Sequence, residues 1–182
     1  MRDLSPVDWA MRPLKNYAKF SGRASRAEFW WFFLFVMIVY IVIMIALGTM
    51  GGIAAMNPAA ALLTGSAGIG VVLLGLFWLA MFIPMLAAQI RRLHDINRSG
   101  WWLGGFWLVY LAYVVVTFGS LGANPADGTA PSMGGLAGAA ILGLVMFVYS
   151  IVLLVFLCLR GTQGPNRFGP DPYGEDMEEV FA

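Results

Sequence analysis

Two long stretches of this chain carry almost no charge, and they constrain its fold more than any other feature. The first runs from residue 29 to residue 90 without a charged side chain, and the second runs from 99 to 159 with only Asp127. Each stretch has about sixty residues, whereas one membrane-spanning helix needs roughly 20 apolar residues. Each therefore has room for two spanning helices and a tight connection. We predict an all-α, polytopic membrane protein built from two tandem helical hairpins.

The composition agrees with this class of protein. Hydrophobic residues make up 60% of the 182 residues and charged residues only 12%, against roughly 25% charged in ordinary soluble domains. A soluble domain of this size could not bury so much apolar surface, so the bilayer must act as solvent for much of the chain. Nucleic-acid binding is not expected, because the basic residues are clustered in an apolar chain rather than arranged along a stripe.

The breaks in hydrophobicity divide the chain into three parts. We predict a cytoplasmic arm over 1–28, a four-helix transmembrane domain over 29–160 and a cytoplasmic tail over 161–182. The arm should contain a short interfacial helix that opens at Pro13. We expect the four spans to pack as a bundle. They are predicted at about 29–47, 68–90, 101–118 and 135–159.

Proline and acidic residues mark features outside or within these spans. The Asn-Pro pairs at 57–58 and 124–125 are turn signals in the two outer connections. Pro84 falls inside the second span, where it should kink the helix or leave a carbonyl for a neighbouring segment to use. The acidic tail after residue 174 is expected to be poorly ordered.

The basic residues predict the orientation of the hairpins. All eleven Lys and Arg residues lie before, between or after the two uncharged stretches. The positive-inside rule then places both termini and the middle loop in the cytoplasm. The pairs Trp30-Trp31 and Trp101-Trp102 would begin the first and third spans as an aromatic belt at the water boundary. The N-terminus lacks the short apolar core of a signal peptide, so the first span is expected to act as an uncleaved insertion signal.

The two halves share features at a period near seventy residues. The two Trp pairs are 71 residues apart, and Arg91 and Arg160 are 69 apart. Such a period is typical of two hairpins in the same orientation, related by an axis along the membrane normal. Any two tandem helical hairpins would share aromatic starts and basic ends, so duplication and coincidence both remain open.

Polar residues gather in three segments that should meet at the cytoplasmic face: 22–28, 91–98 and 164–172. Nine of the eleven basic residues are Arg, whose planar guanidinium group can donate two parallel hydrogen bonds to one phosphate or carboxylate. We therefore predict a site for an anionic lipid, another phosphate-bearing ligand or an acidic partner segment. The candidate residues are Arg23, Arg26, Glu28, Arg91, Arg92, His94, Asp95, Asn97, Arg98, Asn166, Arg167 and Asp171.

Membrane orientation alone also explains many of these positions. Arg91, Arg92 and Arg160 follow the ends of predicted spans, where a cation complements the helix dipole. Glu28 opens the first span, where an anion does the same. We predict no metal site and no cofactor, because the chain has a single histidine, a single cysteine and no recognised nucleotide or hydrolase motif.

Catalysis and transport have weaker support from the residues. His94 and Asp95 are neighbours in sequence, and neighbouring side chains on a helix point about 100° apart rather than at each other. The interiors of the predicted spans contain no Asp, Glu, Lys, Arg or His, which are the usual marks of an ion pathway. An oligomeric transporter or channel component is the second hypothesis, and an enzyme acting on lipid headgroups is the third.

The three polar segments resemble the signatures of a known family. They cover 22–30, 91–102 and 161–172, and the resemblance as a whole spans about 14–173. The family is domain of unknown function 805, which comprises small bacterial inner-membrane proteins. The resemblance implies a bacterial plasma-membrane location and supplies no activity. Our leading hypothesis is a non-enzymatic membrane protein that binds anionic lipid or a partner, with a homo-oligomer or another membrane protein as the possible partners.

Overall fold

The chain forms helices, and four of them are long and apolar enough to cross a membrane. The computed structural model describes residues 4–56, 66–121 and 133–173. The helices are α1 (Pro6–Lys15), α2 (Arg26–Met56), α4 (Ser66–Asp95), α5 (Trp101–Leu121) and α6 (Met133–Cys158). Candidate spans cover 26–49, 72–95, 101–120 and 133–158. The predicted all-α fold with four apolar helices is therefore confirmed. The Asn-Pro turns and the acidic tail lie outside the described residues.

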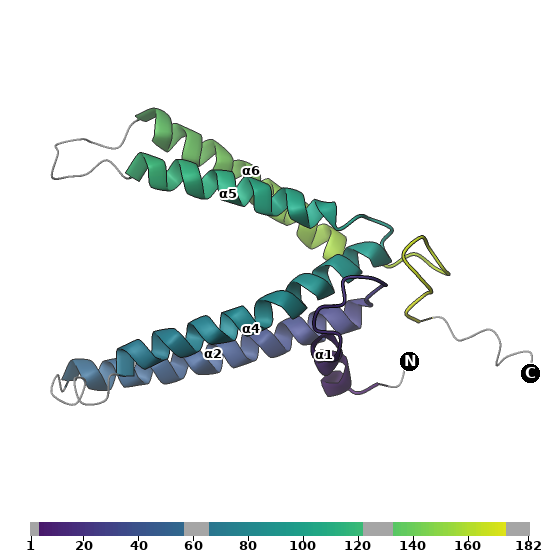
Figure 1. Ribbon diagram of the computed structural model, residues 1–182, viewed down its shortest axis with the longest axis horizontal. Helices are drawn as coiled ribbons and strands as arrows, with labels where there is room; N and C mark the ends of the chain where they lie inside the picture. Colours follow the sequence, from purple (N-terminus) through teal and green to yellow (C-terminus); the bar gives the residue numbers. More distant parts are fainter. Residues whose placement is uncertain (1–3, 57–65, 122–132, 174–182) are drawn as a thin grey trace, which may run out of the picture.

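The helices form two hairpins that diverge like the arms of a V (Figure 1). In one hairpin α2 packs along α4, and in the other α5 packs along α6. In the described part of the chain the two hairpins meet mainly through α4 and α6, near the ends of those helices. Our expectation of a four-helix bundle is thus wrong for this structure. The reason is that lipid chains are as apolar as Leu, so no hydrophobic force closes two apolar hairpins within a bilayer.

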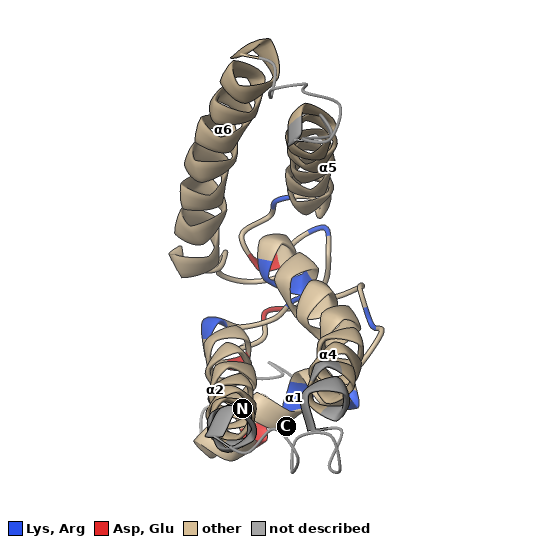
Figure 2. Ribbon diagram, turned by 90° about the vertical axis from the view of Figure 1, so that its left-hand side faces the viewer, with Lys and Arg blue, Asp and Glu red and all other residues tan. Residues whose placement is uncertain are grey.

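The end where the hairpins meet also holds the charged residues, and we call it the polar end. Figure 2 shows Lys, Arg, Asp and Glu near this junction, while long parts of α5 and α6 carry none. Two small apolar cores lie in the same region. Phe29, Phe32 and Ala88 form one between α2 and α4, and Leu93 and Leu103 contribute to the other, which also includes α6. Away from these cores the helices expose large apolar side chains, which the bilayer would cover.

The first helix begins earlier than we predicted. It starts at Pro6 rather than Pro13, because Ser5 caps it and Pro at the first helical position suits the fixed φ of the ring. The Ser5 hydroxyl and Asp8 form a reciprocal capping box. The Ser5 hydroxyl and, to a smaller extent, the Ser5 amide donate hydrogen bonds to the Asp8 carboxylate. These bonds hold the pKa of Asp8 below its usual value. Pro13 is buried inside the helix, and Trp9 is buried where α1 packs against α2 and α4.

A tyrosine after α1 uses the carbonyl that Pro84 leaves free. Proline has no N–H, so the carbonyl four residues earlier, that of Ala80, lacks its helical donor. The Tyr17 hydroxyl donates to this carbonyl oxygen at 2.6 Å. Our expectation that a neighbouring segment would use the carbonyl is confirmed. The contact fixes the arm against α4.

Tyr17→Phe should lower the free energy of unfolding by about 0.5–1.5 kcal/mol, because it removes this hydrogen bond and keeps the ring. Tyr40→Phe is the matched control: the Tyr40 ring packs edge-on against Trp78, and no described residue accepts from its hydroxyl. Chemical unfolding of the detergent-solubilised protein measures both. In a Pro84→Ala background the Tyr17→Phe effect should shrink, since the new N–H bonds the same carbonyl. Equal losses in both backgrounds would contradict this role for Tyr17.

Candidate functional site

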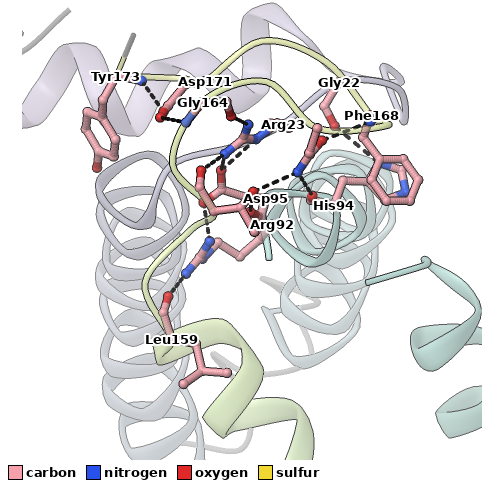
Figure 3. A network of polar contacts seen from close by, with 12 residues as sticks. Gly22, Arg23, Arg92, His94, Asp95, Leu159, Gly164, Phe168, Asp171 and Tyr173 are labelled. Carbon is pink, nitrogen blue, oxygen red and sulfur yellow. Dashed lines mark hydrogen bonds and ion pairs between the residues drawn. The ribbon is translucent and has the colours of Figure 1, made fainter. Parts of the chain in front are cut away.

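The carboxylate of Asp95 lies at the centre of the polar end (Figure 3). Asp95 is the last residue of α4 and is only 2% exposed. Its Oδ1 accepts a hydrogen bond from Nε of Arg23 at 3.0 Å, and its Oδ2 accepts one from Arg92 at 2.5 Å. Both guanidinium groups are buried with it. Two cations thus share one anion that is almost entirely shielded from water.

Arg23 joins all three polar segments that the sequence singled out. Besides Asp95, its terminal nitrogens donate to the carbonyls of Gly164 at 2.6 Å and Thr162 at 2.5 Å. Next to it, the amide of Ala24 donates to the Arg91 carbonyl at 3.0 Å. A guanidinium has five donors in a fixed plane, so one side chain can fix several backbones in this way.

Arg92 joins the two hairpins. It is fully buried and donates to the carbonyls of Leu157, at 3.1 Å, and Leu159. The last carbonyls of a helix have no intrahelical donor and carry partial negative charge. A cation from α4 therefore satisfies the end of α6, and this contact holds the hairpins together at the polar end.

The segment after α6 satisfies the end of α4 in return. Thr162 donates to the carbonyl of Asp95 through its amide at 2.9 Å and its hydroxyl at 3.1 Å. The Asn166 side-chain amide donates to the carbonyl of His94 and to the Thr162 hydroxyl, both at 3.0 Å. Gly161 passes so close that a side chain there would overlap the Asp95 carboxylate. The residues of this Asp95 network are Arg23, Arg92, Asp95, Thr162 and Asn166.

Asn97 lies in the turn that ends α4. Its φ of 58° is left-handed, a conformation that asparagine tolerates better than most residues. The Asn97 amide donates to the His94 carbonyl, and the Arg98 amide donates to the Leu93 carbonyl. These two hydrogen bonds form the Schellman motif. The Arg98 guanidinium lies over the Phe156 ring at 5.6 Å. Both predicted site residues therefore have structural partners.

His94 is held by stacking and by one backbone contact. Its ring lies parallel to that of Phe168, with centroids 3.9 Å apart, and its Nδ1 lies 3.2 Å from the Gly22 carbonyl. Phe168 is presented by a tight turn in which the backbones of Asn166 and Gly169 exchange hydrogen bonds. The Arg167 guanidinium also lies over the Phe168 ring, 4.7 Å from its centroid. No carboxylate among the described residues is hydrogen-bonded to His94.

Glu28 and Arg91 form a second buried pair beside α1. Their side chains meet at 2.6 Å, and Arg12 approaches the same carboxylate at 3.9 Å. Ser25 accepts from the Glu28 amide and so caps α2. Two nitrogens of Arg91 are buried without an acceptor among the described residues. This pair fixes α1 and the start of α2 to α4.

A polar cavity of about 420 Å³ lies beside the Asp95 network. We call it the Arg26 cavity. It is lined by Arg26, Asp95, Arg160, Gly161, Thr162, Gln163, Asp171 and Tyr173. Its walls come from the start of α2, the end of α4 and the segment after α6. A cavity of this size suits a small polar ligand or a lipid headgroup.

The lining groups differ in whether they already have partners. Asp95 is paired with two arginines, and both oxygens of Asp171 accept backbone N–H groups, from Gly164 and Tyr173. In contrast, no described residue forms a salt bridge or a hydrogen bond with the side chain of Arg26 or Arg160. Among the described residues that line the cavity, these two guanidinium groups are the cations without such a partner.

The sequence reasoning found part of this cavity and missed the rest. It selected Arg26, Asp95 and Asp171 but explained Arg160 by the helix dipole alone and did not select Thr162, Gln163 or Tyr173. The missed signal was position: Arg160 directly precedes the third family segment, 161–172, Thr162 and Gln163 lie in it, and Tyr173 directly follows it. The remaining predicted residues belong to the Asp95 network or lie near it, and each has a partner within the fold. They are Arg23, Glu28, Arg91, Arg92, His94, Asn97, Arg98, Asn166 and Arg167.

Comparison with known proteins identifies relatives of nearly the same length. The family model described as "Protein of unknown function (DUF805)" matches residues 17–170. Inner membrane protein YhaH of Escherichia coli (strain K12) is 32% identical over 166 residues, which are 91% of this chain and 97% of that protein. Inner membrane protein YhaI of the same strain is 33% identical over 166 residues, covering 91% of this chain and 96% of its own. No solved structure matches the chain.

Asp95→Asn should destabilise the protein by about 3–5 kcal/mol, because it leaves two buried guanidinium groups without a negative partner. The measurement is the unfolding free energy in detergent, by circular dichroism. Asp8→Asn is the control: Asp8 is exposed on α1, and its loss should destabilise the protein much less than the loss of Asp95. Similar small effects for both variants would contradict the central place of Asp95.

Proposed function

This chain belongs to the DUF805 family of proteins of unknown function, and on that premise we propose that it is a non-enzymatic inner-membrane protein that binds an anionic, phosphate-bearing group at the cytoplasmic face. The binding site is the Arg26 cavity. The observation that carries the proposal is the difference between the arginines. Arg23, Arg91 and Arg92 are paired within the fold, whereas Arg26 and Arg160 line the cavity without such partners.

The charge of the site favours an anion. Four guanidinium groups in and around the cavity face two carboxylates, which leaves a net charge of +2. These groups are Arg23, Arg26, Arg92, Arg160, Asp95 and Asp171. The Asp171 oxygens are occupied by backbone donors that close the segment 164–173. The guanidinium groups of Arg26 and Arg160, beside an Asp95 network with net positive charge, match the geometry and charge of phosphate oxygens.

The proposed orientation places the polar end in the cytoplasm. Basic residues cluster at this end on both hairpins, as the positive-inside rule requires of cytoplasmic segments. The two similar proteins from E. coli are named as inner membrane proteins. Basic pockets between membrane helices on the cytoplasmic side are a known form of site for anionic headgroups.

A topology reporter tests this orientation. After Ala182, a fluorescent protein, which works in the cytoplasm, should give a signal and a phosphatase, which works outside, should not. After Asp127 the result should be the reverse, because an odd number of spans separates the two sites. The measurement is paired phosphatase and fluorescent-protein activity in intact cells. An external signal from the Ala182 fusion would reverse the orientation.

The other functions have less support. The His94 ring is stacked on Phe168 and lies against the Gly22 carbonyl, so the one histidine has no described acid–base partner for catalysis. The described interiors of the spans carry few polar side chains for an ion path. Two of these, Gln89 and Ser150, line one apolar cavity of about 250 Å³ between the hairpins.

The double variant Arg26→Gln and Arg160→Gln should lose at least about tenfold in affinity for phosphate-bearing ligands, since hydrogen bonds to charged groups contribute about 1.5–3 kcal/mol each. Native mass spectrometry of the detergent-purified protein, with anionic lipid added back at known concentrations, measures the retained ligand. Both side chains are exposed, so the fold should survive.

Arg98→Gln is the matched control, because it removes an exposed arginine of the polar end that lies over Phe156 and outside the cavity. It should leave retention unchanged. Equal losses from Arg98→Gln and from the double variant would show that retention reflects general charge rather than the cavity. Unchanged retention in the double variant would reject the proposed site.

A further inference from the structure

We propose that the anion in the Arg26 cavity is the headgroup of a membrane phospholipid, and that an acyl chain of this lipid lies in an adjoining groove between α2 and α6. This inference rests on the proposed anion site and names the source of its ligand. The groove, which we call the Trp31 groove, measures about 510 Å³. It is lined by Arg26, Ala27, Trp30, Trp31, Leu34 and Cys158.

Arg26 lies on the wall of both the cavity and the groove. An arginine side chain has an apolar stem and a charged head, and it can cover apolar surface with one while the other binds a polar group. One side chain therefore marks the place where a polar site changes into an apolar one. A glycerophospholipid changes in the same way where its phosphate joins the acyl chains.

The groove has the chemistry of a lipid surface. Apart from Arg26 its lining is apolar or aromatic, and Trp31 and Leu34 are 40% and 45% exposed. Trp30 and Trp31 come in the second turn of a candidate span, where indole rings usually lie at the headgroup level of a bilayer. Cys158 ends α6 on the opposite wall. The groove is open rather than enclosed.

The groove distinguishes a lipid from a free phosphate. A soluble phosphate needs the cavity alone and gains nothing from the apolar wall. The acyl chain of a membrane lipid lies beside its phosphate, so one lipid can contact the cavity and the groove together; within the bilayer its gain comes from packing against the groove wall. The positive charge of the cavity further favours an anionic headgroup, such as phosphatidylglycerol, over a zwitterionic one.

Photo-crosslinking in nanodiscs tests the lipid with the unaltered protein. Phosphatidylglycerol and phosphatidylcholine would each carry the same diazirine acyl chain, diluted in unlabelled phosphatidylcholine. Crosslinks from phosphatidylglycerol should be enriched in the peptide with Trp30, Trp31 and Leu34 and in the peptide with Cys158. The peptide that begins α5 with Trp101 is the internal control, because it lies at the same end of the molecule but outside the groove. Equal distributions for the two lipids would overturn the proposal.

Two variants separate the groove from the cavity. Arg26→Gln with Arg160→Gln should reduce the phosphatidylglycerol enrichment by about tenfold or more. Cys158→Phe fills the groove at an exposed position and should reduce the enrichment while leaving binding of the water-soluble headgroup glycerophosphoglycerol unchanged. If Cys158→Phe left the enrichment intact, the acyl chain would not lie in this groove.

The soluble headgroup separates this inference from the proposed function. Binding of glycerophosphoglycerol that depends on Arg26 and Arg160, without lipid enrichment in the groove, would keep the anion site and reject the phospholipid. No binding of either ligand would reject both. Enrichment that Arg26→Gln and Arg160→Gln do not change would reject the link between the cavity and the groove.

Discussion

The burial of one carboxylate between two guanidinium groups is the interaction on which the polar end depends. Taking such charges out of water costs several kcal/mol for each ion, so they persist only where geometry and further hydrogen bonds compensate. Here the remaining donors of Arg23 bond backbone carbonyls in the segment after α6. Arg92 bonds a backbone carbonyl at the end of α6 itself. Asp95 therefore fixes three segments that are far apart in sequence, and none of them can move without exposing an unpaired buried charge.

This network does for the two hairpins what hydrophobic packing does for a soluble bundle. Within a bilayer, two apolar hairpins gain little by closing on each other, because lipid already surrounds them. The Arg92 guanidinium, which comes from α4, instead satisfies carbonyls at the end of α6. The hairpins are joined at one end and diverge toward the other (Figure 1). The lining residues of the Trp31 groove and the Arg26 cavity come from this joined end.

The arginines divide into two groups that sequence alone does not separate. Arg23, Arg91 and Arg92 are buried against carboxylates and backbone carbonyls, and they explain why three separate motifs occur together. Arg26 and Arg160 lie at the rim, where the fold gives them no partner of their own. The first group builds the site and the second group faces it. Substitution of the first group would therefore disturb the fold before it revealed anything about a ligand.

The sequence by itself determined the helical class, the four apolar helices and the gathering of polar motifs at one end, because these follow from hydrophobicity and charge spacing along the chain. It also determined that Pro84 would free a carbonyl, which is a local property of the ring. Only the tertiary structure decided that Tyr17 uses this carbonyl, that Arg92 caps α6 and that Arg160 faces the cavity. Each of these depends on where side chains from different helices point, which charge spacing does not encode. The sequence did not predict the open V either, because an apolar helix face that contacts lipid and one that contacts another helix have the same composition.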